Sequence, residues 1–457
     1  MNRLNMQKLV WFVFVLLVVG ACKKDEISYT ALKTNEWIKE NMELYYLWNN
    51  KLPNIDETKE PDPAAYFEKL LYSSLDKWSW ITDDYASLET EYAGTPVTYG
   101  VDASPTWTSS SQTEVCFIVN FVYPGSAAET AGLKRGDIIL KLNGAVITGD
   151  NYMTFYNSTS MTIQLASIVN GALVLNGTSY SLTAKTTTTD PSIYHEVLEI
   201  DGKKIGYLVY VEFVAGSNDM FLTSLDNIFS EFKTEGVTDL ILDLRYNPGG
   251  EIDAAAYLAS AIAPNSVVTQ HKALVNMKYN TELQAFLESD SKYADNLTYK
   301  FVDNATNLNL SRLYCLTTGG SASASELLMI GLAPYMDVYR IGETTYGKYT
   351  GMWVLPDDNE EWCMLPVVMK YSNIDGLTDF ASGLAPDYAV EDYLTLGYEF
   401  GNTEDPMLEK AISLITGTVT STASAKSARV NLLEPANLAN PRDIKRNLFV
   451  PTPTGIE

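Results

Sequence analysis

The sequence predicts a multidomain protein of mixed helix and strand, of the α+β and α/β classes, and three observations lead to that fold class. The chain has 457 residues, which at roughly 150 residues per domain corresponds to two or three domains. Hydrophobic residues make up 46% of the chain and charged residues 19%, a balance that favours packed cores over disorder. The pattern of apolar residues also changes along the chain, and each change marks an expected domain boundary.

The first residues have the features of a secretion signal. Arg3 and Lys8 precede an apolar run over residues 9–20, which is typical of a signal peptide and too short for an ordinary membrane span. The run ends in Val-Gly-Ala-Cys, which resembles a bacterial lipobox. This resemblance implies that residues 1–21 are removed and that Cys22 carries a lipid, so we expect a lipoprotein of the bacterial cell envelope, anchored to the outer membrane on its periplasmic or surface face. An ordinary signal peptide with an incidental cysteine is the alternative.

Residues 22–94 and 189–415 carry the helical patterns. Over residues 34–48 and 62–75, apolar residues recur at helical spacing, which predicts a small helical N-terminal region. From residue 189 onward, apolar runs typical of buried strands alternate with apolar helical runs, which predicts an α/β core. The strands are expected near 205–211, 240–244 and 313–317, and the helices near 220–234, 254–262 and 325–332. Residues 416–457 show little periodicity and are expected to form a loosely held tail.

Residues 95–188 are expected to form a mostly β module, because short alternating runs are separated there by Ser/Thr-rich loops. Within this module, residues 126–130 predict a short helix that ends at Gly132. Residues 138–142 predict a strand that leads into an Asn-Gly turn. The pattern resembles a PDZ domain, which adds an extended peptide to its own edge strand and holds the peptide's terminal carboxylate in backbone amides.

The PDZ resemblance implies a carboxylate-binding loop at Tyr99, Gly100 and Val101. The peptides bound there would be exposed C-terminal or unfolded segments of protein substrates. A purely structural PDZ-like spacer is the alternative, because residues 102–113 are predicted to form a long loop that could cover the peptide groove.

Composition excludes several classes of function. The net charge of −25 is opposite in sign to the field that attracts nucleic acid, so no nucleic-acid partner is expected. The chain has two histidines, His195 and His271, which leaves few ways to build a zinc site or a Ser-His-Asp triad. The cysteines beyond the lipobox are too sparse for a disulfide framework, so we expect buried thiols, with one disulfide pair as the alternative. These cysteines are Cys116, Cys315 and Cys363.

Two segments carry the candidate chemistry. In the first, a predicted buried strand at 240–244 is followed by Asn247, Pro248, Gly249 and Gly250. Glycines in such a turn let backbone N–H groups approach a ligand closely, which suits an oxyanion hole. A plain strand-to-helix turn is the alternative.

The second segment runs from a predicted strand end through Gly319 and Gly320 to Ser323, at the start of a predicted helix. A hydroxyl at a helix N-terminus gains from the positive end of the helix dipole, and the N–H of Ala324 can face a developing oxyanion. Ser323 and Glu326 also fit a capping-box pattern, which is the alternative interpretation.

A lysine 25 residues after Ser323 favours the catalytic interpretation. Lys348 ends the sequence Gly-Glu-Thr-Thr-Tyr-Gly-Lys, which follows a predicted strand at 338–341. Together, the three segments resemble the C-terminal processing peptidases, or tail-specific proteases, whose serine lies in S-A-S-A-S-E and whose lysine lies in G-x-T-x-G-K at the same separation. The resemblance covers roughly residues 34–412 and includes an Asp-Leu-Arg-x-Asn-x-Gly-Gly element.

The resemblance implies a serine endopeptidase with a Ser-Lys dyad, an inserted PDZ domain and a core of the crotonase/Clp-like ββα type. Ser323 would be the nucleophile and Lys348 its general base. The N–H groups of Ala324 and of Gly249 or Gly250 would bind the oxyanion. A lysine is a base only when it is neutral, so we expect Lys348 to be buried. Such chemistry needs no metal or organic cofactor.

The sequence departs from the family pattern at two positions. Many relatives carry a glutamine at the position of Met352 and an acidic residue at the position of Pro334, so the residue that orients the lysine is unassigned. A catalytically weak or inactive peptide-binding lipoprotein on the same scaffold is therefore the alternative function. A second Ser-x-x-Lys pair, Ser289 and Lys292, lacks the downstream Lys-Thr-Gly of penicillin-recognising enzymes.

Overall fold

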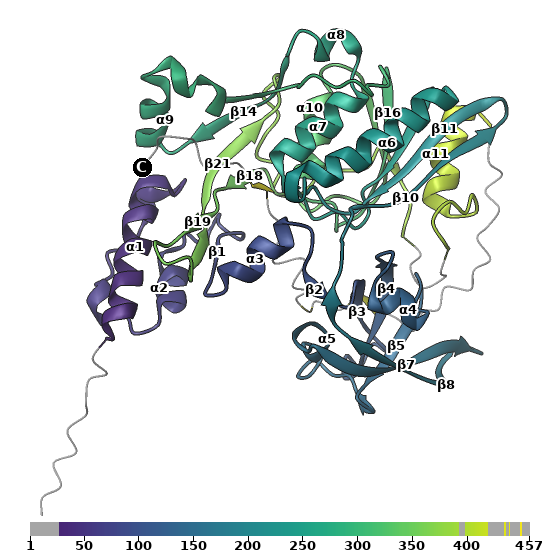
Figure 1. Ribbon diagram of the computed structural model, residues 1–457, viewed down its shortest axis with the longest axis horizontal. Coiled ribbons are helices and arrows are strands. Elements are labelled where there is room, and N and C mark those ends of the chain that lie inside the picture. The colour runs from purple at the N-terminus through teal and green to yellow at the C-terminus, as the bar shows by residue number, and fades with distance from the viewer. Residues whose placement is uncertain (1–26, 393–397, 419–433, 436–437, 439–447, 450–457) are drawn as a thin grey trace, which may run out of the picture.

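The computed structural model describes residues 27–392, 398–418, 434–435, 438 and 448–449. Figure 1 shows a helical N-terminal region, a β module and a larger body in which helices cover a sheet. The predicted mixed fold class is therefore confirmed. Within the described residues, no helix combines the length and the apolar character needed to cross a membrane.

The N-terminal region is helical, as predicted. Its elements are α1 (Tyr29–Tyr45), α2 (Pro63–Leu70), α3 (Tyr85–Tyr92) and the short strand β1 (Trp80–Thr82). Helix α1 begins earlier than the apolar spacing predicts, because the Ser28 side chain caps it by accepting the Ala31 N–H at 3.0 Å. Asp62 caps α2 in the same way. Met42 of α1 and Phe67 of α2 are buried in the main core, so this region packs as part of the larger body.

The β module has the predicted helix and strand order. Its elements are β2 (Val97–Thr98), β3 (Val101–Trp107), β4 (Val115–Val122), α4 (Ala127–Ala131), β5 (Ile138–Leu142), β6 (Ala145–Val146), α5 (Thr154–Asn157), β7 (Ser160–Val169), β8 (Ala172–Thr183) and β9 (Lys185–Thr186). The sheet order is β3-β4-β5-β7-β8. Helix α4 is capped by Ser126 and ends at Gly132, whose φ is 87°.

The predicted loop over residues 102–113 is wrong. Its first half, residues 102–107, belongs to strand β3, which pairs antiparallel with β4 along its whole length, and only residues 108–113 of it lie in the connection between the two strands. Serine and proline residues have a weak preference for strands, but pairing with the apolar strand β4 overrides that preference. The connection between the two strands is correspondingly short.

The larger body is built on a six-stranded sheet of order β10-β11-β12-β16-β17-β22. The strands are β10 (Ser192–Ile200), β11 (Lys203–Tyr210), β12 (Asp239–Asp243), β16 (Arg312–Thr317), β17 (Asp337–Gly342) and β22 (Tyr388–Ala389). The pairing of β10 with β11 is antiparallel, and the other pairings in this sheet are parallel.

Helices lie on both faces of this sheet. They are α6 (Met220–Glu235), α7 (Ile252–Ile262) and α10 (Ala324–Leu332) on one face and α11 (Pro406–Thr416) on the other. Successive residues of β12 divide between the faces: Leu240 and Leu242 pack in the cluster with α6, α7 and α10, whereas Ile241 packs in the cluster with α11. Buried strands with helices on both faces explain why the sequence shows continuous apolar runs here.

A second sheet lies beside the first and has the order β13-β24-β18-β21-β14-β15. The strands are β13 (Gly250–Glu251), β24 (Leu448–Phe449), β18 (Thr350–Met352), β21 (Val367–Ser372), β14 (Ala273–Tyr279) and β15 (Thr298–Lys300), and the helices α8 (Asn265–Val268) and α9 (Thr281–Glu288) flank β14 in sequence. A small third sheet has the order β1-β20-β19, with β19 (Leu355–Pro356) and β20 (Cys363–Leu365), so the N-terminal region donates one of its strands.

The structure bears on the expectations for the cysteines and for the C-terminal tail. Cys116, Cys315 and Cys363 are free and buried, which confirms the expectation of unpaired thiols. The tail expected over 416–457 contains two described pieces that form short strands. Strand β23 (Glu434–Pro435) pairs with β3 of the β module, and β24 pairs with β13 and β18 of the larger body.

Candidate active site

Ser323 occupies an unusual position at the start of helix α10. Its backbone has φ 59° and ψ −109°, a left-handed conformation that is strained for a residue with a Cβ. Glu326 accepts the Ser323 N–H at 2.8 Å, which completes one half of the predicted capping box. The Ser323 side chain faces the Glu326 N–H, as the other half of the box requires, but Ser323 Oγ is buried and forms no hydrogen bond among the described residues. Buried hydroxyls are normally bonded, so this one is available for another task.

Lys348 lies in the loop after β17 and is completely buried. Burial lowers the pKa of its ammonium from 10.5 to about 7, because the charged form loses its hydration, while the carboxylates of Asp76 and Glu326 oppose this shift. Its Nζ lies 3.1 Å from Met352 Sδ, and a thioether is a weak acceptor that favours the ammonium little. The expectation that Lys348 is buried is met in this structure.

Tyr371 and Glu326 hold the serine and lysine segments together. The hydroxyl of Tyr371, on β21, lies 3.0 Å from the carbonyl oxygen of Ser323 and 2.7 Å from that of Lys348. The carboxylate of Glu326 accepts the N–H groups of Gly347 at 2.7 Å and of Lys348 at 2.9 Å, in addition to that of Ser323. Two buried side chains thus fix the backbone on both sides of the candidate dyad.

The buried carboxyl of Glu326 has its own altered titration. Burial raises its pKa from 4.5 to about 7, and hydrogen bonds from Thr345 and from three backbone N–H groups partly offset that increase. Because these donors all favour the ionised carboxylate, the charge of Glu326 is stabilised locally even though the site is dry.

The turn after β12 lies directly beside the Ser323 loop. The carbonyl oxygen of Asn247 accepts the Ala322 N–H at 3.1 Å and the Ser325 hydroxyl at 3.0 Å. Gly250 has φ 135°, and a Cβ there would lie 2.0 Å from the carbonyl oxygen of Phe213, so only glycine fits. The turn and the start of α10 are therefore locked in one arrangement.

The predicted oxyanion donors differ in availability. The N–H of Gly249 already donates to Asn247 Oδ1 at 2.9 Å. Ala324 is the first residue of α10, where a backbone N–H has no acceptor within its own helix. Ala324 is therefore better placed to bind an oxyanion than Gly249 is.

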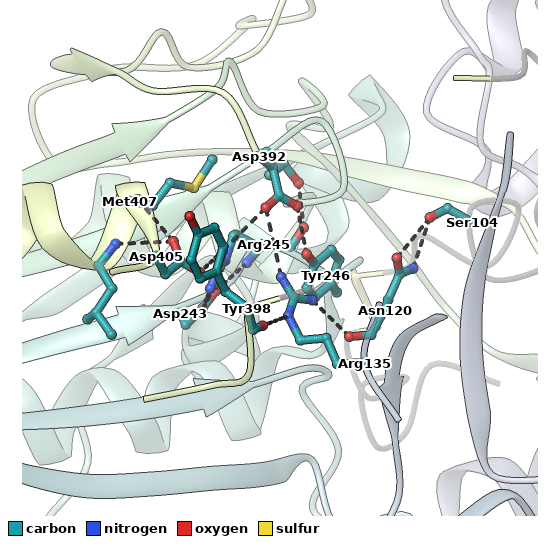
Figure 2. A network of polar contacts seen from close by, with 12 residues as sticks. Ser104, Asn120, Arg135, Asp243, Arg245, Tyr246, Asp392, Tyr398, Asp405 and Met407 are labelled. Carbon is teal, nitrogen blue, oxygen red and sulfur yellow. Dashed lines mark hydrogen bonds and ion pairs between the residues drawn. The ribbon is translucent and has the colours of Figure 1, made fainter. Parts of the chain in front are cut away.

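A buried cluster of charges lies around Arg245, two residues before Asn247, as Figure 2 shows for its members Asp243, Asp392 and Asp405. Arg245 is completely buried, and its guanidinium lies 2.6 Å from Asp243, 2.7 Å from Asp405 and 3.3 Å from Asp392. Charge-assisted bonds of this kind are strong and orient both partners. The strand end that leads into the glycine turn is thus held in place by ion pairs.

Arg135 joins the β module to this cluster. Its guanidinium donates to the carbonyl oxygens of Asn120 and Tyr398, each at 2.8 Å, and lies over the rings of Tyr246 and Phe400, 5.0 and 4.7 Å from their centroids. The Tyr246 hydroxyl in turn donates to Asp392 at 2.6 Å (Figure 2). Contact between the two parts of the chain therefore runs next to the glycine turn.

The residues of the expected carboxylate-binding loop pack against the start of α4. The carbonyl oxygens of Tyr99 and Gly100 accept the N–H groups of Ala128 and Tyr123, and the Gly100 N–H donates to Thr98 Oγ1 at 3.1 Å. Strand β3 begins at Val101. This is the loop-then-strand arrangement that a peptide-binding edge requires.

The structure brings the segments of Ser323, Ala324, Lys348, Gly249 and Gly250 next to one another, and the roles predicted for these residues stay predictions. Several residues around them were not indicated by the sequence. No local signal marks the contribution of Tyr371 or Asp76, because both lie far from the motifs in sequence. Within the described residues, no group of three or more His, Cys, Asp or Glu side chains could hold a metal ion. Cys22 lies outside the described residues.

Comparison with known families gives three matches along the chain. The peptidase family S41 matches residues 204–390, and the peptidase S41 N-terminal domain matches residues 33–80. A PDZ domain matches residues 118–152, inside the β module.

Known proteins with similar sequences are proteases by name. The chain is 26% identical over 273 residues to a probable CtpA-like serine protease of Staphylococcus aureus, which covers 58% of this chain and 48% of that protein. It is 26% identical over 310 residues to a carboxyl-terminal-processing protease of a Picosynechococcus species, covering 64% and 65%. The chain thus spans about half to two thirds of the length of these relatives.

One solved structure is similar over most of the chain. It is a putative S41 protease from Bacteroides fragilis, 28% identical, with a TM-score of 0.68, and the match covers 84% of this chain and 98% of that one.

The buried charge cluster makes a prediction about stability. Replacing Arg245 by methionine leaves Asp243, Asp392 and Asp405 buried without their main cation, so the free energy of unfolding should fall by about 3–5 kcal/mol. Chemical denaturation measures this loss. Arg340→Met is the matched control: its pair with Asp387 is partly exposed and should contribute less than about 1 kcal/mol. Similar losses in both variants would contradict the role given to Arg245.

Proposed function

The chain belongs to peptidase family S41, and from that premise we propose that it is a serine endopeptidase in which Ser323 attacks the peptide carbonyl and Lys348 is the general base. One observation carries the proposal. The Lys348 amino group is completely buried, with a pKa lowered to about 7, in the loop that Glu326 and Tyr371 tie to a buried serine with an unbonded hydroxyl. A lysine in such surroundings is largely neutral at slightly alkaline pH and can accept a proton.

The reaction follows from these groups. Neutral Lys348 takes the proton of Ser323 Oγ as the oxygen attacks the substrate carbonyl, and the N–H groups of Ala324 and Gly250 stabilise the oxyanion. Lys348 then returns the proton to the leaving amine, and water hydrolyses the acyl-enzyme. Ser323 Oγ forms no hydrogen bond to Lys348 here, so the serine side chain must rotate toward the amine when substrate binds; catalytic hydrogen bonds are often unformed in free enzymes.

We assign exposed C-terminal or unfolded segments of proteins as the substrates. Strand β3 follows the Tyr99–Val101 loop as the peptide-binding strand of a PDZ domain does, and Arg135 links this module to the glycine turn through Tyr246 and Asp392. A bound peptide would therefore be held close to the site of cleavage. The alternative, a peptide-binding protein without catalysis, is favoured by the departure from the family pattern at Met352.

We also propose that the protein is a lipoprotein of the bacterial outer membrane, anchored through Cys22. The support is the apolar run followed by Val-Gly-Ala-Cys in the sequence. Replacing Cys22 by serine should abolish incorporation of labelled fatty acid and release the protein from the membrane fraction. Unchanged labelling would show that the cysteine is incidental.

The nucleophile is tested by replacing Ser323 with alanine, which should reduce cleavage of an unfolded protein by about 10⁴-fold or more, because the covalent route is lost. Mass spectrometry of new termini measures cleavage. Ser289→Ala is the control, since Ser289 belongs to the second Ser-x-x-Lys pair and its hydroxyl caps a carbonyl on an exposed turn. Equal activity of the Ser323 variant and the intact chain would eliminate the proposed mechanism.

The role of Lys348 as general base predicts that the rate of cleavage depends on pH. Lys348 must be neutral, and its pKa is lowered to about 7, so kcat/KM should be low below that pH, rise through about pH 7 and level off above it. The carboxyls that face Lys348, Glu326 and Asp76, shape this transition because their negative charges favour the ammonium. Initial rates from pH 5 to 9 give the profile. A rate that falls as pH rises through 7 would rule out this base.

Substitution of Met352 should change the pH at which kcat/KM rises. Glutamine at this position presents a carbonyl oxygen to Nζ, a stronger acceptor that favours the ammonium, so Met352→Gln should move the midpoint upward by about one pH unit, equivalent to about 1.4 kcal/mol. Met352→Leu removes the sulfur without adding an acceptor and serves as the control, with no upward shift. The pH profiles of both variants check this, and identical midpoints would mean that Met352 does not act on Lys348.

A further inference from the structure

Two described pieces of the C-terminal part of the chain form strands with distant parts of the molecule. Glu434 and Pro435 form β23, which pairs antiparallel with β3 opposite Trp107 and Thr106. Leu448 and Phe449 form β24, which pairs with β13 and β18. We call β23, Leu438 and β24 together the terminal segment.

Strand β23 occupies the peptide-binding edge of the PDZ-like module. The other edge of β3 pairs with β4, so β23 takes the side that is free to accept a further strand. Leu438 packs against the apolar core of the same module. Nearer the Tyr99–Val101 loop, the Tyr156 hydroxyl donates to the carbonyl oxygen of Ala103 at 3.1 Å. The edge that would bind a peptide by strand addition is thus already partly filled.

Strand β24 lies at the candidate active site. It runs parallel to β13 and β18 and joins them, with Leu448 opposite Gly250 and Phe449 opposite Glu251 and Met352. Gly250 is a proposed oxyanion donor, and the sulfur of Met352 contacts the Lys348 amine. Among the described strands, β24 alone connects β13 to the rest of this sheet. It therefore fills the slot between the two segments that carry the chemistry.

We propose that the described strands of the terminal segment act as an intramolecular peptide ligand, with β23 at the PDZ edge and β24 in the active-site slot, and that substrates bind by displacing them. The proposal rests on the proposed function, because it assigns that site's regulation and the form of its substrate. The substrate enters as an extended strand, parallel to β13 and β18, in the place of Leu448 and Phe449.

The pairing of β23 and β24 is weak enough for a substrate to displace them. Each of β23 and β24 pairs over two residues only, so each contributes few backbone hydrogen bonds, and the net contribution of one such bond is about 1 kcal/mol. Tethering raises the effective concentration of the segment to the order of millimolar. Weakly binding peptides are thereby excluded, while a substrate that pairs over a longer stretch of both edges can replace the segment.

Substitution of Leu448 by proline in the full chain tests the proposal. Proline cannot donate a ladder hydrogen bond, so β24 should leave the slot, and kcat/KM for an unfolded protein should rise about tenfold relative to the intact chain. Thr452→Pro, beyond the paired residues, is the matched control and should leave the rate unchanged. Unchanged cleavage by the Leu448 variant would overturn the inference while leaving the proposed function standing.

A binding measurement separates this inference from the proposed function. In chains that carry Ser323→Ala, a fluorescent peptide of residues 444–453 should bind the Leu448→Pro variant and should bind the Thr452→Pro variant at least about tenfold more weakly. Anisotropy gives both affinities. If this difference appears while no chain with an intact Ser323 cleaves anything, the proposed function fails and the inference stands. Equal affinities would overturn the inference.

Two further variants test β24 if the Leu448→Pro chain does not fold, and test β23 separately. If the Leu448→Pro chain does not fold, a Leu448→Gly, Phe449→Gly chain weakens the strand without forbidding it, and the same rise in peptide affinity is expected. Leu438→Asp places a charge against the PDZ core and should increase binding of a peptide of residues 430–440 to the module. No increase in that variant would overturn the PDZ half of the inference.

Discussion

The buried amino group of Lys348 is the constraint on which the rest of this structure depends. A lysine that is buried loses the hydration of its charged form, and that loss lowers its pKa to about 7. The protein must therefore keep water away from one side chain while leaving room for a peptide beside it. Most of the architecture around the site serves one of these two requirements.

Water is excluded by parts of the chain that lie far apart in sequence. Trp78 of the N-terminal region packs edge-on against Tyr349, with ring centroids 5.9 Å apart, and both belong to an apolar cluster that includes Met352. Tyr371 contacts the backbone carbonyls of both candidate catalytic residues. The glycine turn lies beside the Ser323 loop, held by the Arg245 cluster and by the contact of Asn247 with Ser325.

The sequence was most informative where chemistry and local conformation coincide. The glycines around Gly250, the serine at a helix start and the lysine after a strand are local patterns, because each reflects a backbone conformation that few residues adopt. Their relative spacing then indicated the family. Strand β3 was missed because its Ser and Pro residues weigh against a strand, and only pairing with β4 shows otherwise. Tyr371, Asp76 and the terminal segment act through tertiary contacts that no local pattern encodes.

The strand that the N-terminal region donates to the third sheet has a consequence for how mutations in that region would appear. Strand β1 pairs with β20, and two residues separate the end of β1 from the start of helix α3. The apolar cluster that shields Lys348 is assembled from these elements. A loosened helix there would admit water to the lysine without touching the site directly. The resulting defect would look like a change in the basicity of one amine, so a genetic screen could map a catalytic phenotype to residues that carry no chemistry.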